Sequence, residues 1–267
     1  MQFEVNGSKV FASTGGREHT EGQPWVLFLH GAGNCHLTWT QQVRSFAYNG
    51  YNVLAPDMPG HNLSDGEPIF GIEAQAEWLI GVMDALNIDQ AHLVGHSQGG
   101  IIALEAAILA PSKIVSITFV ATAAAIPANP ALIEMAEENP EKAFNLMVSW
   151  GSGTSAHTHD NSVPGVSLID AGLRVMGLNA PEALATDLRS CASYENGVAS
   201  AQKLTCPSLC IFAKLDKMTP VRSGRVLAEN LTNNELHVLD GVGHTLPLEK
   251  PQEVNQLIKN FYLSNFK

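Results

Sequence analysis

The amino-acid sequence predicts an α/β fold in which a mostly parallel, eight-stranded sheet carries helices on both faces. Two observations support this prediction. Short apolar runs alternate with longer helical segments over most of the 267 residues, which is typical of parallel strands joined by helices. The segment 26–30 is an apolar run that ends before glycine, as expected of a strand that is buried on both faces of a sheet, and 114–121 is predicted to be another buried strand.

The first expected element is a hairpin, because Asn6-Gly7 separates two short runs and Asn-Gly is a strong turn signal. The later strands are apolar runs that stop at glycine or proline, and the helices are longer stretches rich in Ala, Leu and Ile. The expected strands are 3–5, 10–12, 26–30, 53–55, 93–95, 114–121, 209–213 and 235–239. The expected helices are 37–48, 72–86, 97–110, 132–138, 141–150, 181–192, 221–230 and 252–263.

The alternation of strands and helices stops after Thr122. Residues 123–203 contain helical pieces and loops but no convincing strand, and strand-like texture returns only afterwards. We therefore expect a core formed by 1–122 and 204–267, with a helical cap at 123–203 inserted between two strands. Functional residues of such a core are expected at the carboxyl ends of its strands.

Composition excludes some classes of function. Hydrophobic residues make up 45% of the chain, and 26 acidic against 15 basic residues give a net charge of −11. Nucleic acids and anionic membranes need clustered Lys and Arg, so we expect neither as a partner. The four cysteines are sparse, and no signal peptide or membrane span is visible, which predicts reduced thiols and a cytoplasmic location. We expect a monomer or homodimer that acts on a small molecule.

The sequence Gly95-His96-Ser97-Gln98-Gly99 lies between an expected strand and an expected helix. A sharp strand-to-helix turn would hold Ser97 in a strained conformation at the positive end of the helix. There the backbone N–H of Gln98 would stabilise a developing oxyanion. The competing interpretation is that Ser97 only caps the helix.

A serine hydroxyl needs a base, and His244 follows the last expected strand on a glycine-containing loop. Asp216, just after the strand 209–213, is the preferred carboxylate to orient this histidine. Asp240 is the rival, but it lies only four residues before His244 and on the same loop, so Asp216 is preferred.

With these residues in place, the sequence resembles the α/β-hydrolase superfamily over nearly its whole length. Four segments carry the resemblance: "HGAGNCHLTW" at 30–39, "DMPGHNLSDG" at 57–66, "GHSQGG" at 95–100, and "GVGHTLPLEKP" at 241–251 with the preceding Asp216. The chain order Ser, Asp, His is also that of the family.

The resemblance implies that Ala32 supplies the second oxyanion N–H, and that catalysis proceeds through an acyl-enzyme without a cofactor or metal. One departure is Asn62, which stands where the family usually has glycine. A carboxylesterase for small or medium esters is the function we expect. Family members with the same triad also include carbon–carbon bond hydrolases, cofactor-free perhydrolases or haloperoxidases, and receptors with little turnover, so these remain alternatives.

Other side chains are weaker candidates. Trp150, Met176 and Met218 are predicted to line the substrate pocket, although each residue type is found more often in a core. His36 is expected at the pocket mouth. The segment 157–160, His-Thr-His-Asp, is interpreted as a solvated loop rather than a metal site.

Overall fold

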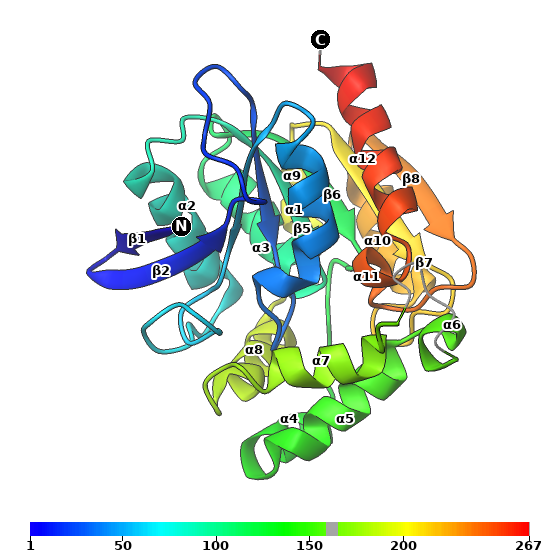
Figure 1. Ribbon diagram of the computed structural model, residues 1–267. Helices are drawn as coiled ribbons and strands as arrows, with labels where there is room; N and C mark the ends of the chain where they lie inside the picture. The colour runs from blue at the N-terminus through cyan, green and yellow to red at the C-terminus, as the bar shows by residue number, and fades with distance from the viewer. Residues whose placement is uncertain (159–164, 267) are drawn as a thin grey trace.

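The computed structural model describes residues 1–158 and 165–266, and it contains one eight-stranded sheet (Figure 1). The strand order is β1-β2-β4-β3-β5-β6-β7-β8, and all neighbours from β4 to β8 run parallel, whereas β1 and β2 are antiparallel. The strands are β1 (Gln2–Val5), β2 (Ser8–Ser13), β3 (Trp25–Leu29), β4 (Asn52–Pro56), β5 (Ala91–His96), β6 (Ile114–Val120), β7 (Ser208–Ala213) and β8 (Asn234–Leu239). The predicted fold class is confirmed, and all the expected strands are present with small differences at their ends.

The helices of the core alternate with the parallel strands. Their bounds are η1 (His36–Trp39, a 3-10 helix), α1 (Thr40–Ala47), α2 (Ile72–Ala85), α3 (Gln98–Leu109), α10 (Val221–Asn230), α11 (Leu246–Glu249) and α12 (Pro251–Asn265). Between β6 and β7 the structure places α4 (Pro130–Glu138), α5 (Pro140–Gly151), α6 (Thr154–His157), α7 (Leu168–Met176), α8 (Ala183–Ser193) and α9 (Gly197–Lys203). None of the described helices is both long enough and apolar enough to cross a bilayer.

Four of these helices, α6, α7, α9 and α11, were not expected from the sequence. Two of them, α6 and α11, have only four residues each, too few for a helical period to be visible. The sequence of α9, GVASAQK, begins with glycine and is rich in small residues, so intrinsic propensity does not favour a helix there. Contacts with α3 and α10 stabilise it instead.

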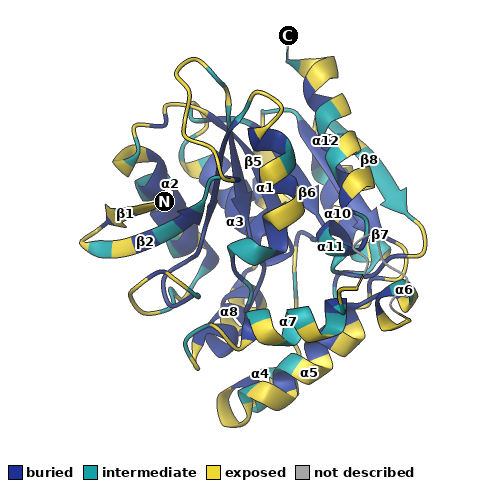
Figure 2. Ribbon diagram, viewed as in Figure 1, coloured by how far each residue is buried: buried dark blue, intermediate teal, exposed yellow. Residues whose placement is uncertain are grey.

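The sheet separates two apolar layers. Along β3, Leu27 and Leu29 face the layer that also holds residues of α2, α3 and α10, whereas Val26 and Phe28 face α1 and α12. This alternation follows from the two-residue period of a strand. Because both faces are covered, the parallel strands β3 to β7 are almost wholly buried, whereas β8 at the edge of the sheet is only partly buried (Figure 2).

A third apolar cluster joins α4, α5, α7 and α8, which lie together at one end of the sheet (Figure 1). Ala32, which follows the carboxyl end of β3, packs into this cluster. These four helices therefore cover the edge of the sheet at which functional residues are expected.

Helix α3 approaches the sheet so closely that two glycines are required. A Cβ atom on Gly99 would lie 2.4 Å from the carbonyl oxygen of Leu29, and one on Gly95 would lie 2.2 Å from the carbonyl oxygen of Gly99. Backbone atoms cannot move away as a flexible side chain can. The close packing of β3, β5 and α3 therefore depends on the absence of these side chains.

We expect Gly99→Ala to lower the free energy of unfolding by about 2 kcal/mol or more, because α3 must move away from β3 to admit the methyl group. Gly81→Ala is the matched control. Its Cβ would make an ordinary contact, 3.4 Å from Val5 Cγ1, and alanine favours the helix. Urea unfolding of both variants measures the difference. Equal stability of Gly99→Ala and wild type would contradict the close approach.

Candidate active site

Ser97 occupies a strained turn between β5 and α3. Its backbone has φ of 53° and ψ of −118°, a region that non-glycine residues rarely adopt. Two hydrogen bonds hold it there: Ser97 N donates to Val120 O at 2.9 Å, and Thr122 Oγ1 donates to Ser97 O at 2.7 Å. The Ser97 side chain makes no capping hydrogen bond to α3, so the structure gives no support to the interpretation of this serine as a cap.

The loop after β3 lies directly against Ser97. A Cβ atom on Gly31 would lie only 3.1 Å from Ser97 Cβ, so the next residue, Ala32, is held beside the serine. On the other side, Gln98 is the first residue of α3, where backbone N–H groups have no partner within the helix. Ala32 and Gln98, the residues proposed from the sequence to supply the oxyanion N–H groups, thus both lie next to Ser97.

His244 and Asp216 are in contact. His244 Nδ1 lies 2.8 Å from Asp216 Oδ2, and both side chains are buried. Asp216 also accepts hydrogen bonds from Met218 N, Thr219 N and Thr219 Oγ1, each at 2.8 Å. Burial by itself raises the pKa of Asp216, but the charge and hydrogen bond of His244 together with the Thr219 donors outweigh it, and the pKa is lowered. The carboxylate is therefore ionised at neutral pH and orients the imidazole.

Asp240, the rival carboxylate, is far more exposed. It forms an ion pair with Lys214 at 2.7 Å, and 77% of its side chain is accessible to solvent. The structure brings Asp216, and not Asp240, to His244.

Ser97, His244 and Ala32 line one cavity of about 510 Å³ beneath the helices that follow β6. Trp150, Met176 and Met218, the side chains that we predicted to line a substrate pocket, all lie on its wall. Met176 is buried, whereas Trp150 is 54% exposed and stands at the opening.

The comparisons with known proteins agree with this geometry. Residues 24–251 match the family model described as the alpha/beta hydrolase fold. The chain belongs to the α/β-hydrolase family. Its relatives include 3-oxoadipate enol-lactonase 1 of Acinetobacter baylyi, 28% identical over 250 residues that span 91% of this chain and 90% of that protein.

Two further proteins show the range of the family. A 2-hydroxy-6-oxo-6-phenylhexa-2,4-dienoate hydrolase of Burkholderia cepacia is 29% identical over 259 residues, covering 88% of this chain and 86% of that protein. A thermophilic esterase from Thermogutta terrifontis, solved with malate bound, superposes with a TM-score of 0.86 at 21% identity, over 100% of this chain and 99% of that one. At this level of identity, the similarity to the Thermogutta esterase shows a shared fold and not a shared activity. The relatives support a serine hydrolase without settling which bond is cleaved.

In this α/β-hydrolase, His96 supports the histidine loop rather than the serine hydroxyl. Its Nε2 donates to the carbonyl oxygen of His244 at 2.8 Å, and the two rings lie 4.7 Å apart. Burial, together with the charge of His244, lowers the pKa of His96 to about 3, so the ring is neutral and Nε2 carries its proton.

Glu249 is a buried residue that the sequence analysis missed. Its carboxylate accepts from Gly243 N, Gly153 N and Thr245 Oγ1, at distances between 2.8 and 3.3 Å. His244 N in turn donates to Gly151 O at 2.6 Å. One carboxylate thus joins the histidine loop to the end of α5. No sequence signal marks it beyond its place shortly after His244, because burial of a glutamate depends on long-range contacts.

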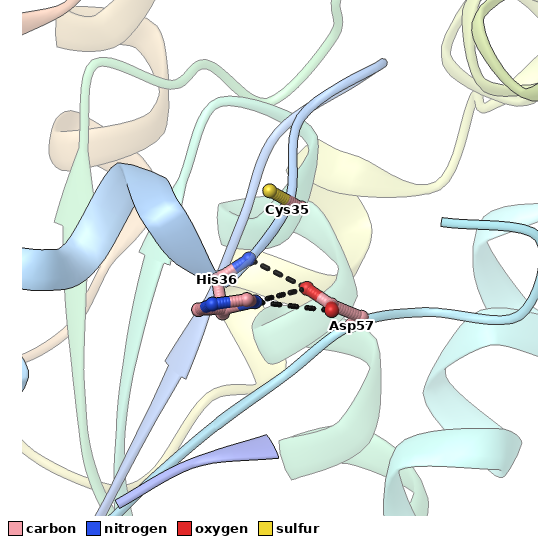
Figure 3. Close-up of side chains that lie close together, drawn as sticks. All are labelled: Cys35, His36 and Asp57. Atoms are coloured by element: carbon pink, nitrogen blue, oxygen red, sulfur yellow. Dashed lines mark hydrogen bonds and ion pairs between the residues drawn. The ribbon is translucent and has the colours of Figure 1, made fainter. Parts of the chain in front are cut away.

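Cys35, His36 and Asp57 form a compact group with three types of metal ligand (Figure 3). Asp57 already accepts from His36 N at 2.7 Å, from His36 Nδ1 at 2.9 Å, and from Asn62 Nδ2 and Leu63 N, both at 3.3 Å. Burial and the charge of Asp57 raise the pKa of the Cys35 thiol to about 12, which disfavours the thiolate that a metal needs. The group therefore fits a hydrogen-bonded pair of His36 and Asp57 that braces two loops.

Two other predictions concern histidines outside this site. His36 does not line the cavity, so its expected place at the pocket mouth is wrong, and the reason is its pairing with Asp57. In the segment 157–160, His157 is exposed and its Nε2 lies 3.1 Å from Ser149 O. His159 and Asp160 lie outside the described residues.

We expect Asp216→Asn to lower kcat by about 10⁴-fold, because the amide can no longer hold the His244 tautomer and its positive charge. Asp240→Asn, a surface change of the same kind, serves as the control and should leave kcat unchanged. Both are measured with p-nitrophenyl butyrate. If Asp240→Asn is the slower of the two variants, the assignment of the orienting carboxylate is wrong.

Proposed function

We propose that this α/β-hydrolase is a serine esterase that hydrolyses neutral carboxylic esters with small or medium apolar acyl groups. The observation that carries the proposal is the strained Ser97, which shares an apolar cavity with a histidine that is paired to a buried carboxylate. Strain of this kind persists only where the surrounding structure enforces it, and it exposes the hydroxyl to a bound substrate.

The proposed reaction has two steps. Ser97 Oγ attacks the ester carbonyl carbon while His244 Nε2 takes its proton, and Asp216 stabilises the resulting imidazolium. The N–H groups of Ala32 and Gln98 donate to the oxyanion, and the alcohol leaves with the proton from His244. Water then attacks the acyl-enzyme with His244 again as the base, which releases the carboxylic acid and restores the serine.

The cavity wall supports an uncharged, apolar substrate. Of the described residues that line the cavity, only Lys217 carries a permanent charge, and it is exposed. Burying a substrate carboxylate without a cationic partner would cost several kcal/mol. The remaining wall is mainly aliphatic, with contributions from Ile126, Leu132, Met135, Leu146, Met147, Val148, Met176, Leu188 and Met218.

A carbon–carbon bond hydrolase is the second candidate, because one observation favours it. The Burkholderia cepacia relative is named for a substrate with one carboxylate and one phenyl group. A cavity with apolar walls and a single lysine at its edge would suit both ends of such a molecule. The same wall is a poorer match for a dicarboxylate, which would need a second cation.

Fluorophosphonate labelling and ester hydrolysis test the proposed esterase. We expect wild-type protein to be labelled at Ser97 and to hydrolyse p-nitrophenyl esters from acetate to octanoate. Ser97→Ala should lose label and reduce kcat by at least about 10⁴-fold, because the nucleophile is gone while the N–H donors remain. Wild-type turnover in Ser97→Ala would exclude this nucleophile. Labelling without turnover of any ester or of the phenyl dienoate would instead indicate a receptor-like scaffold.

Lys217→Ala distinguishes the two candidate reactions. For an esterase of neutral substrates, kcat/KM for p-nitrophenyl butyrate is unchanged, and the phenyl dienoate is turned over more slowly than the ester. Lys214→Ala is the control, because this nearby lysine does not line the cavity. Faster turnover of the dienoate, with a KM that only Lys217→Ala raises, would favour the carbon–carbon bond hydrolase.

A further inference from the structure

Asp187 is a fully buried carboxylate on α8 that contacts three separate segments of the core. Its Oδ2 accepts from Gly33 N at 2.8 Å and lies 3.0 Å from His61 Nε2, while its Oδ1 accepts from Gln98 Nε2 at 3.2 Å. Gly33 belongs to the loop after β3 and Gln98 is the first residue of α3, and these are the two segments that flank Ser97. Neither composition nor any motif pointed to Asp187, because the helix that carries it is far away in the chain.

The hydrogen bonds of His61 require it to be charged. Its Nδ1 lies 2.9 Å from Pro59 O, and its Nε2 lies 3.0 Å from Asp187 Oδ2. A carbonyl oxygen and an ionised carboxylate can both accept hydrogen bonds, but neither can donate one. Both ring nitrogens must therefore carry protons, which makes His61 an imidazolium that pairs with Asp187.

His30, whose ring lies 5.0 Å from that of His61, shows the opposite pattern. Its Nδ1 lies 3.0 Å from Gly31 O, whereas its Nε2 accepts from Met58 N at 3.2 Å. One nitrogen donates and the other accepts, so the ring is neutral. Burial lowers the pKa of His30 to about 4, in agreement with this arrangement.

Three ionisable side chains from different elements surround His61. Asp187 comes from α8, Asp57 follows β4, and the neutral His30 follows β3. Burial alone lowers the pKa of His61, but the charge and hydrogen bond of Asp187, aided by Asp57, outweigh it, and the pKa is raised. Burial likewise raises the pKa of Asp187, but the pairing with His61 and the Gly33 N–H lower it overall. The thiol of Cys191 is the other titratable group near Asp187.

The contacts of Asp187 fix the backbone at both proposed oxyanion donors. The Gly33 N–H that it binds belongs to the peptide that follows Ala32. The Gln98 side chain is held between Asp187 and Gln75 Oε1, 3.0 Å away, at the first residue of α3. Movement of the carboxylate would release both loops together.

We propose that the buried Asp187–His61 ion pair is a clasp that positions the oxyanion hole from the cap side. Asp187 and His61 are then positioning residues, since neither lines the cavity. The inference rests on the proposed function in one respect, namely that Ala32 and Gln98 act as oxyanion donors. It assigns to α8 a part in the chemistry in addition to covering the pocket.

Asp187→Asn tests the clasp directly. An amide cannot accept from His61, Gly33 and Gln98 at once, so one loop must shift, and a displacement of about 1 Å costs about 100-fold in rate. We expect kcat for p-nitrophenyl butyrate to fall by about that factor with little change in KM, because the oxyanion forms only after binding. Glu137→Gln is the control, since it removes the exposed ion pair between Arg189 of α8 and α4. It should leave kcat and KM unchanged.

The pH dependence of kcat in His61→Gln gives a second test of the clasp, which does not require Asp187→Asn to fold. In wild type the ion pair is complete at pH values below the ordinary histidine pKa of about 6.5, and it is lost as the pH rises through the raised pKa of His61. The neutral ring keeps one proton, so it can donate to Asp187 Oδ2 or to Pro59 O but not to both, and the charge that pairs with the carboxylate is gone. We expect kcat of wild type to fall on the alkaline side, whereas the side-chain amide introduced by His61→Gln donates at every pH and removes this fall.

NMR of the histidine rings provides a readout without turnover. At pH 6.5, the ordinary histidine pKa, His61 should mainly carry protons on both nitrogens in wild type because its pKa is raised, and Asp187→Asn should abolish this state. A neutral His61 in wild type, or an active wild type with an equally active and folded Asp187→Asn, would overturn the clasp alone. A wild type that neither hydrolyses esters nor is labelled by fluorophosphonate would overturn the proposed function, and with it the role of the clasp.

Discussion

The close approach of helix α3 to strands β3 and β5 is the constraint on which the site depends. Glycines at 95 and 99 let backbone meet backbone, and the chain between them can turn only if Ser97 adopts a positive φ. The strain is stored locally and is opposed by the two buried apolar layers on either side of the sheet. The hydroxyl is thereby presented at the carboxyl edge of the sheet, where three other loops also end.

Buried carboxylates organise those loops. Asp216 orients the imidazole, Glu249 joins the histidine loop to the end of α5, and Asp187 joins α8 to the loops on either side of the serine. Each accepts at least three hydrogen bonds, which offsets the cost of removing a charge from water. Two of the three, Glu249 and Asp187, cross from the core to the inserted helices. The cap is thus held to the core by polar contacts as well as by the apolar cluster around Ala32.

The buried carboxylates and the cavity wall differ in polarity, and this difference indicates which substrates the cavity can hold. The buried carboxylates lie behind the loops, whereas the wall that a substrate would meet is mainly apolar, and Lys217, the permanently charged residue among the described residues that line it, is exposed. A preorganised set of donors in an apolar cavity is suited to stabilising a negative charge that develops during reaction. It is less suited to a substrate that brings several charges of its own.

Much of the fold could be predicted from the sequence. Apolar runs identify the buried parallel strands, and the Asn6-Gly7 turn identifies the hairpin of β1 and β2, because both signals are local. Short helices such as α9 and α11 were missed because packing, and not propensity, stabilises them. Asn62 illustrates an intermediate case: its φ of 44° is left-handed, a conformation that asparagine tolerates better than most residues, which accounts for its presence where the resemblance expects glycine.

The candidate site, like the fold, was predicted in part from the sequence and decided in part by the structure. The sequence by itself determined the residue types and their order, since Ser97, Asp216 and His244 each follow a recognisable strand. Only the tertiary structure decided between Asp216 and Asp240, placed His36 away from the pocket, and revealed Glu249 and Asp187. The physical reason is that a carboxylate's role depends on its burial and on the donors that surround it. Those donors come from segments far away in the chain, and no local pattern records which of them will meet.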